Sequence, residues 1–347
     1  MAPGMKSIVY SETGPAPTVL QLVDRDLPEP AAGEVRVRVV WSGVNPTDWK
    51  SRAGGGRGES LPFAEVTPNQ DGSGVVDAVG EGVTGLAVGD RVWTYLSAHQ
   101  RPTGTAQEFT VLPASRVVPL PEGVGLEVGA SLGVPAMTAH RALTVWEDGP
   151  SRLEPGSLDG AVVLVAGGAG AVGHAAIQLA RWAGATVITT ISGDEKAGLA
   201  TAAGAHHVVN YRTGDAAAEI REIAPDGVDV VVEVAISQNA DLLSEVVAHR
   251  ASVAIYADDG GDTTTIPIRA NMITNTRFQF VLLYTVGEEA LQAAVEDVTA
   301  ALRDGVLPVG EAAGLPLHTF PLAETAAAHE AVEGGVVGKV LIEVSAG

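Results

Sequence analysis

Residues 161–173 read AVVLVAGGAGAVG, and this stretch decides the fold. Residues 161–166 form a short, wholly apolar run, which suits a parallel strand covered on both faces. Gly168, Gly170 and Gly173 then give the spacing G-x-G-x-x-G, and residues 171–183 have the character of an alanine-rich helix. A glycine turn between a buried strand and a helix is typical of a dinucleotide-binding unit.

Strand and helix patterns alternate regularly beyond this turn. We expect strands at residues 186–191, 207–210, 228–234 and 252–256, and helices at 194–203, 215–223 and 239–248. The alternation predicts an α/β fold with a doubly wound (Rossmann) domain. Residues 277–284 (RFQFVLLY) look like a further strand, 288–303 are helical, and 336–344 form a final strand.

The first third of the chain has a different texture. Residues 34–41 (EVRVRVVW) alternate apolar and charged side chains with a period of two, as a half-buried strand does. Further strands are expected at residues 74–79, 90–95, 109–112 and 115–119. This part of the chain is therefore predicted to be β-rich.

Composition narrows the classes of function. The chain has 347 residues, 46% of them hydrophobic, and its net charge of −21 argues against nucleic acid or an anionic membrane as the main partner. No apolar run approaches the ~20 residues of a membrane span, and the N-terminus lacks an apolar signal region, so we expect a cytoplasmic protein. The absence of cysteine excludes disulfides and every cysteine-ligated metal site.

The glycine loop is expected to hold a pyrophosphate. Its backbone, at Gly168, Gly170, Ala171, Val172 and Gly173, turns tightly, and a helix N-terminus offers unpaired N–H groups and a partial positive charge to an anion. The alternative is a tight strand-to-helix turn without a ligand.

The residues after the next strand bear on which dinucleotide binds. NAD-binding domains usually place Asp or Glu there, ~20 residues past the glycines. Here the strand ends at Ser192, with Lys196 about one helical turn later and Tyr211 closing the following strand, and these three favour the 2′-phosphate of NADPH. Asp194 and Glu195 argue the other way, but acids at the start of a helix commonly serve as caps.

Several segments, in order, resemble the zinc-independent quinone oxidoreductase (zeta-crystallin-like) branch of the medium-chain dehydrogenases/reductases, over nearly the whole chain. They are GVNPTD at 43–48, DGSGVV at 71–76, GDRV at 89–92, GTAQEF at 104–109, VPAMTA at 134–139, the glycine loop, NYR at 210–212 and GKV at 338–340. The resemblance implies a discontinuous, GroES-like catalytic domain at 1–134 and 285–347, and a Rossmann NADPH-binding domain at 135–284.

The resemblance also bears on metal. Zinc-dependent relatives carry a ligating Cys where this chain has Asn45, and a His-Glu pair where it has Gln70-Asp71. We therefore predict no metal. Without a Lewis acid, reduction of an electron-poor acceptor becomes more plausible than oxidation of an alcohol.

Site residues follow from the same resemblance. Asn45 and Asp48 are implied on the catalytic side of the cofactor cleft, although Asn45 also suits a turn before Pro46 and Asp48 also suits a structural role as acceptor of backbone N–H groups. Cofactor contacts are implied for three further residues, Thr138, Tyr256 and Lys339; the alternative role of Thr138 is to cap a helix. Candidate aromatics of the substrate pocket are Trp49, Tyr95 and Phe280, each of which alone more often packs in a core.

The primary hypothesis is hydride transfer from NADPH to a quinone or similar acceptor. Alternatives are a 2-alkenal or enoyl reductase acting on an enone, and a non-catalytic NADPH-binding protein. The apolar strand at 277–284 suits the edge of a sheet, which needs pairing or cover, so a homodimer is expected.

Overall fold

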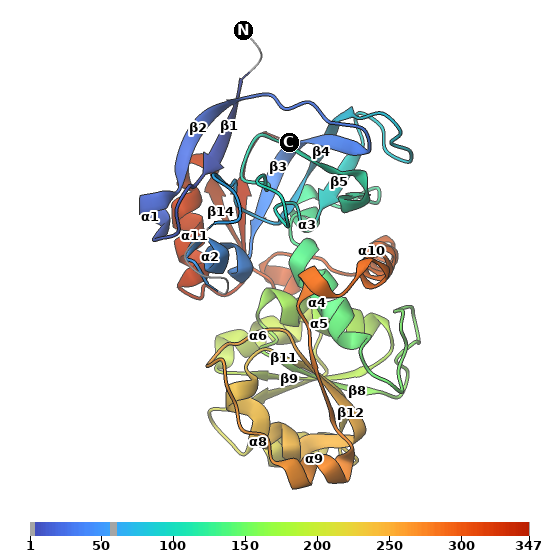
Figure 1. Cartoon of the computed structure of the whole chain (residues 1–347). Coiled ribbons are helices and arrows are strands. Elements are labelled where there is room, and N and C mark those ends of the chain that lie inside the picture. The colour runs from blue at the N-terminus through green and yellow to red at the C-terminus, as the bar shows by residue number, and fades with distance from the viewer. Residues whose placement is uncertain (1–3, 56–60, 347) are drawn as a thin grey trace. The chain divides into compact units, whose positions relative to one another are not determined.

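The computed structural model describes residues 4–55 and 61–346, and its contacts divide the chain into two compact units (Figure 1). Unit 1 comprises Met1–Val134 and Leu317–Gly347, and unit 2 comprises Pro135–Pro316. Residues 56–60 of the glycine-rich loop after Asp48 lie outside the described residues.

The second boundary differs from the expected one at residue 285. Helix α10 (Glu288–Arg303) belongs to unit 2, where residues of that unit form hydrogen bonds with its Asp297 side chain. The Asp297 carboxylate accepts hydrogen bonds from the Leu153 N–H at 2.7 Å and from Arg152 Nε at 2.9 Å, and it lies 2.7 Å from His140 Nε2. No local sequence pattern in residues 285–316 predicts these contacts.

Unit 2 contains the predicted doubly wound sheet. Within the described residues it has six parallel strands in the order β10-β9-β8-β11-β12-β13. Their bounds are β8 (Val162–Ala166), β9 (Thr186–Ile191), β10 (His207–Asn210), β11 (Val228–Glu233), β12 (Val247–Ile255) and β13 (Arg277–Phe280). The strand order reverses between β8 and β11, which is the point where open α/β sheets bind ligands, at the carboxyl ends of the strands.

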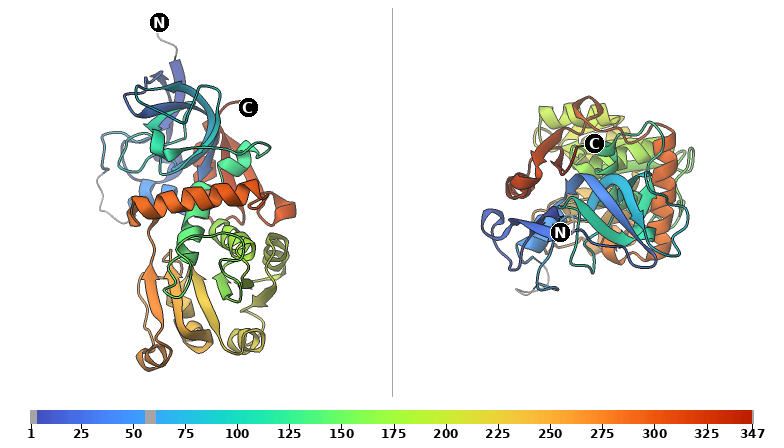
Figure 2. Two further views of the ribbon diagram at one scale, coloured as in Figure 1. Left: turned by 90° about the vertical axis from the view of Figure 1, so that its right-hand side faces the viewer. Right: turned by 90° about the horizontal axis from the view of Figure 1, so that it is seen from above.

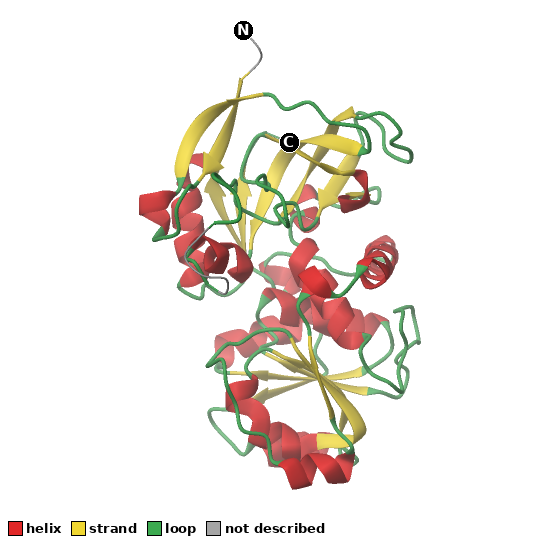
Figure 3. Ribbon diagram, viewed as in Figure 1, coloured by secondary structure: helices red, strands yellow, loops and turns green. Residues whose placement is uncertain are grey.

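Helices cover both faces of this sheet. Figure 1 shows α5 (Ala171–Trp182) and α6 (Asp194–Ala203) on one face and α8 (Ile236–Val246) and α9 (Ile268–Thr274) on the other, and Figure 3 shows the same layers by type of structure. The remaining helix of the alternation is α7 (Ala216–Ile223). Apolar strand side chains fill the layer under α7 and α8, among them Leu164, Ile188, Val231 and Val253. Full burial of one such side chain stabilises the fold by about 1.5–3 kcal/mol.

Unit 1 is β-rich, as predicted. Its described residues form a two-stranded sheet, β1-β2, and a mixed seven-stranded sheet in which β14-β15-β3-β4-β5-β7 follow one another and β6 also pairs with β3. The bounds are β1 (Gly4–Val9), β2 (Gln21–Asp26), β3 (Glu34–Val44), β4 (Asp71–Val79), β5 (Arg91–Thr94), β6 (Phe109–Pro113), β7 (Val117–Pro119), β14 (Leu317–Pro321) and β15 (Lys339–Glu343).

Short helices complete the chain. They are α1 (Ala16–Val19), α2 (Pro46–Arg52), α3 (Leu126–Gly129), α4 (Gly133–Leu143) and α11 (Thr325–Glu333). Helices α1 and α2 both contact α11, so segments from the two ends of the chain pack together in unit 1. No helix of residues 4–55 and 61–346 is long and apolar enough to cross a membrane.

Several expected elements differ in their bounds. Strand β12, expected at 252–256, begins already at Val247, within the helix expected at 239–248. The strand expected at 277–284 ends at Phe280 and is followed by a 3-10 turn at Leu283–Thr285. Helix α8 begins at Ile236 rather than at 239, and a 3-10 turn at Ala114–Arg116 precedes β7. Strand β13 lies at the edge of its sheet beside β12, as the left view of Figure 2 shows.

Candidate active site

The glycine loop joins β8 to α5 and is shaped by close packing. Gly167 has a φ of 73°, in the left-handed region that favours glycine. A Cβ at Gly168 would lie 2.2 Å from Thr189 Oγ1, and one at Gly173 would lie 2.4 Å from the Gly167 carbonyl oxygen. Gly167 was not among the predicted residues of the loop, although the two consecutive glycines at 167–168 already indicate a tight turn.

The N-terminus of α5 presents an anion-binding surface. Gly170 is the residue before the helix, no side chain caps it, and the first turn contains no acid. Unpaired N–H groups and the positive end of the helix dipole therefore meet at Ala171, Val172 and Gly173. The loop and the helix end together fit a pyrophosphate.

Parallel pairing of β9 and β10 brings two of the three residues expected at the 2′-phosphate, Ser192 and Tyr211, to neighbouring positions. Asn210 pairs with Ile191, and the Tyr211 N–H donates to the Ile191 carbonyl at 3.2 Å. Ser192 and Tyr211 thus follow directly after paired residues at the carboxyl edge of the sheet. Lys196 lies in the first turn of α6, and its neighbour Glu195 is exposed.

Tyr256 lies at the same edge, directly after β12. Its N–H donates to the Glu233 carbonyl at 3.1 Å, at the end of β11. The Glu233 side chain is fully buried, accepts a hydrogen bond from Asn239 Nδ2 at 2.9 Å, and has an Oε2 atom without a partner. Burial raises the pKa of Glu233, and burial followed by the nearby Glu233 and Asp259 charges raises the pKa of Tyr256. Glu233 was not among the predicted site residues, although an acid at the end of an apolar strand is visible in the sequence.

Two further predicted site residues of unit 2 lie on other elements, a helix and the last strand of the sheet. Thr138 is buried on α4. Phe280 is 70% exposed at the end of the edge strand β13. The structure does not bring Phe280 together with the glycine loop into one cluster of side chains.

The catalytic candidates of unit 1 lie where β3 passes into α2. Asn45 precedes α2, and Asp48 in its first turn accepts hydrogen bonds from the Asn45 N–H at 2.7 Å and the Gln70 N–H at 3.1 Å. These bonds agree with the structural role considered for Asp48. They hold the start of the helix against the strand that follows.

Asn45 also meets two charged side chains. Asn45 Nδ2 donates to Asp71 Oδ2 at 2.7 Å, and Lys339 Nζ donates to Asn45 Oδ1 at 2.6 Å and to the Val44 carbonyl at 3.2 Å. Lys339 Nζ lies 3.9 Å from Asp71 Oδ2, so this ion pair is long, and the Asn45 amide bridges it. Lys339, expected at the cofactor, therefore binds within unit 1.

Burial controls the charges of this cluster. Burial and the Asp71 carboxylate raise the pKa of Asp48 to about 7, while the Asn45 N–H and the Lys339 ammonium oppose the rise. Burial likewise raises the pKa of Asp71, against Lys339, and lowers the pKa of Lys339, against Asp71 and Asp48. Two carboxylates and one ammonium thus share a site that excludes water.

The aromatic candidates of unit 1 divide. Tyr95 is buried, its hydroxyl donates to the Ser115 carbonyl at 2.8 Å, and its ring lies 5.7 Å from that of Trp93. Tyr95 is thus a core residue. Trp49 is partly buried on α2, with Lys50 Nζ 6.0 Å from its ring centre.

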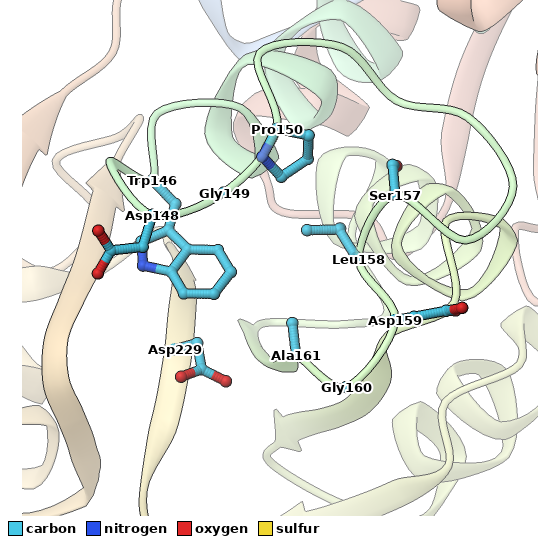
Figure 4. Close-up of a pocket in the computed structure, with 10 residues that line it drawn as sticks. All are labelled: Trp146, Asp148, Gly149, Pro150, Ser157, Leu158, Asp159, Gly160, Ala161 and Asp229. Atoms are coloured by element: carbon cyan, nitrogen blue, oxygen red, sulfur yellow. The ribbon is translucent and has the colours of Figure 1, made fainter.

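A hollow of about 380 Å³ lies in unit 2 near the amino ends of strands β8 and β11 (Figure 4). Trp146 and Asp229 line one side, and Leu158 and Ala161 line the other. Ala161 directly precedes β8 and Asp229 lies at the amino end of β11, whereas ligands of such sheets bind at the carboxyl ends of the strands. None of the predicted site residues lines this hollow. Among the described residues no group of three or more His, Cys, Asp or Glu is placed to hold a metal ion.

Comparison with known proteins defines the class. Residues 31–122 match the family model described as the alcohol dehydrogenase GroES-like domain, and residues 171–300 match that described as zinc-binding dehydrogenase. With the sheet of unit 2 and the β-rich unit 1, these matches define a medium-chain dehydrogenase/reductase. This confirms the predicted fold class.

Individual relatives narrow the class to a family. Quinone oxidoreductase of the rat (Rattus norvegicus) is 32% identical over 97% of this chain and 97% of its own length. The 2-haloacrylate reductase of a Burkholderia species is 30% identical over 97% and 98%. A mycobacterial protein solved with NADPH has a TM-score of 0.79 at 30% identity, covering 98% of this chain and 99% of that chain. The chain therefore belongs to the quinone oxidoreductase family and is an oxidoreductase, as predicted, with a fold that binds NADP in a solved relative.

Proposed function

We propose that the protein transfers hydride from NADPH to an electron-poor acceptor, foremost a quinone, without metal. The observation that carries the proposal is the uncapped N-terminus of α5 after the crowded glycine loop. That arrangement suits a dinucleotide pyrophosphate.

NADPH, when bound, supplies the hydride. The pyrophosphate would rest on the N–H groups at the start of α5, where side chains larger than glycine at 168 and 173 would clash. Ser192, Lys196 and Tyr211 would bind the 2′-phosphate, since β9 and β10 end side by side. The absence of an acid at the tip of β9 favours NADPH over NADH.

The nicotinamide half of the cofactor would lie over β11 and β12, beyond the point between β8 and β11 where the strand order reverses. A pyrophosphate at the end of β8 and a 2′-phosphate at the end of β9 would direct the other half of the cofactor over β11 and β12. Tyr256 follows β12, and we assign it to this half of the cofactor site.

The protein's contribution is positioning and exclusion of water. Asn45 would donate a hydrogen bond to an oxygen of the cofactor or acceptor, and Asp48 would hold its backbone through the bonds at the start of α2. A quinone is already electron-poor, so hydride transfer to it requires no Lewis acid.

A second acceptor class is favoured by one relative. The likeness to a 2-haloacrylate reductase supports reduction of an activated carbon–carbon double bond. Steady-state oxidation of NADPH with benzoquinone, naphthoquinone and 2-alkenals separates the two classes. Turnover with alkenals alone would remove the quinone assignment, and turnover with neither would remove the proposed function.

We also propose a homodimer through the edge of the unit 2 sheet. Among the described residues, β13 is the last strand of its sheet, and Ile268, Met272, Phe280 and Leu282 expose more than half of their surface beside it. An uncovered strand edge with exposed apolar side chains requires pairing or cover, and a second copy provides both.

A further inference from the structure

The Asn45 amide lies between a buried cation and a buried anion. Its Oδ1 accepts a hydrogen bond from Lys339 Nζ at 2.6 Å, and its Nδ2 donates to Asp71 Oδ2 at 2.7 Å. Asn45 and Lys339 are each 1% exposed, and Asp71 is 0% exposed. The amide therefore continues an ammonium-to-carboxylate pair whose charged atoms are 3.9 Å apart.

These two charges permit only one orientation of the amide. A reversed amide would turn its NH₂ group to the ammonium and its carbonyl to the carboxylate, so both favourable contacts would become repulsive. Hydrogen bonds to ionised groups are stronger than those between neutral groups, and more is lost when a buried charge loses its partner. Lys339 and Asp71 thus fix which edge of the amide faces which way.

Strand pairing holds both charged residues in place. Residues 43 and 44 of β3 pair with β15 on one side, and Gly43 pairs with Asp71 of β4 on the other. Asp71 is further anchored by the Val134 N–H, at 2.9 Å from Oδ1 and 3.0 Å from Oδ2. A Cβ on Gly43 would lie 3.2 Å from Lys339 Nζ and 2.3 Å from the Ala130 carbonyl oxygen. The glycine leaves the room that the ammonium occupies.

We propose that Lys339 and Asp71 are positioning residues that hold Asn45 as a hydrogen-bond donor to an oxygen of the bound cofactor or acceptor. An amide nitrogen carries two N–H groups, one of which goes to Asp71, so the second is the donor that Asn45 offers. The inference rests on the proposed function, which supplies the ligand oxygen. It assigns Lys339 a role through Asn45 in place of direct contact with the cofactor.

A double-mutant cycle between Asn45→Ala and Lys339→Met tests this coupling. Methionine keeps most of the lysine stem without its charge or donors. Loss of one polar ligand contact predicts that each single variant lowers kcat/KM about tenfold. If Lys339 acts through Asn45, the double variant loses no more than the worse single variant. Losses that multiply, to about a hundredfold, would overturn the proposal.

A second variant separates positioning from charge balance. Asp71→Asn combined with Lys339→Met removes both partners of the ion pair, while the one side-chain oxygen of Asn at 71 still accepts from Asn45 Nδ2. The melting temperature is expected to recover in part relative to Lys339→Met alone, because the buried Asp71 carboxylate that this substitution leaves without its cation is removed, while the Asp48 carboxyl remains. The loss in kcat/KM is expected to persist. Recovery of both together would show a merely structural pair and sink the proposal.

Separate measurements distinguish whether Asn45 donates to the cofactor or to the acceptor. Coupling in the NADPH dissociation constant places the Asn45 donor on the cofactor, and coupling in the acceptor KM or kcat alone places it on the acceptor. If the wild-type protein binds NADPH but reduces no acceptor, the proposed function fails and the dissociation constants alone complete the cycle. Independent effects in every one of these constants would contradict the positioning role.

Discussion

Replacement of Gly173 by alanine tests the packing that shapes the candidate pyrophosphate site. The new Cβ would lie 2.4 Å from the Gly167 carbonyl oxygen and 2.9 Å from Gly168 Cα, whereas ordinary contact begins at 3.4 Å. Because both neighbours are backbone atoms, α5 must shift from the loop by about 1 Å, the difference between 3.4 and 2.4 Å. Such overpacking costs about 1–3 kcal/mol of stability.

The same shift affects binding. Backbone N–H donors act over a distance range of about 2.7–3.2 Å, so a displacement of about 1 Å breaks their contacts with a phosphate. We expect Gly173→Ala to weaken NADPH binding at least tenfold, which corresponds to about 1.4 kcal/mol. Thermal unfolding and a titration of NADPH fluorescence measure the two effects.

Gly198→Ala is the matched control. Gly198 lies in α6, and a Cβ there would have no atom within 4 Å. Alanine at this exposed helical position should raise stability by about 0.5–1 kcal/mol and leave NADPH binding unchanged. If Gly173→Ala behaved like this control in both assays, the reasoning from loop packing to pyrophosphate binding would be refuted.

Three other predictions concern cofactor choice, stability and assembly. Replacing Ser192 and Lys196 together by alanine should raise the KM for NADPH at least tenfold and change that for NADH little, since only NADPH carries the 2′-phosphate; equal changes for both cofactors would contradict the assignment. Against the raising effect of burial, His140 and Arg152 lower the pKa of Asp297 to about 2, below its ordinary 3.8, so its contribution is present above that ordinary value and is lost as pH falls towards 2. Asp297→Asn should therefore lower the free energy of unfolding by about 2 kcal/mol near neutral pH, with the difference from wild type narrowing in acid; a difference independent of pH would refute the linkage. Phe280→Glu should convert the dimer to a monomer in light scattering, and a wild-type monomer at micromolar concentration would remove the dimer proposal.

Local sequence patterns predicted much of the fold correctly. The apolar run at residues 161–166 and the glycines after it are typical of a dinucleotide-binding turn, and the regular alternation of strand and helix that follows is typical of a parallel α/β sheet. In unit 1, alternation predicted the strand at residues 34–41, and four shorter strands were expected after it, whereas β2 was not among the expected strands. Strand β14 was missed because its residues LHTFP lack both an apolar run and a strict alternation.

Long-range contacts set the limit of the sequence argument. Asn45 was singled out, but its partners Asp71 and Lys339 come from strands whose pairing with β3 no local pattern reveals. Lys339 was therefore assigned to the cofactor rather than to Asn45. The boundary after residue 284 failed to anticipate α10 for the same reason, since the contact of Asp297 with His140 spans 157 residues.

The most direct test of the central claim is the rate of NADPH oxidation with 1,4-benzoquinone by purified protein, measured with and without a metal chelator. The glycine loop, the residues at the tips of β9 and β10, and the absence of cysteine predict saturable turnover that prefers NADPH to NADH and is unaffected by the chelator. No oxidation of NADPH with this or any other electron-poor acceptor, or activity that the chelator abolishes, would contradict it.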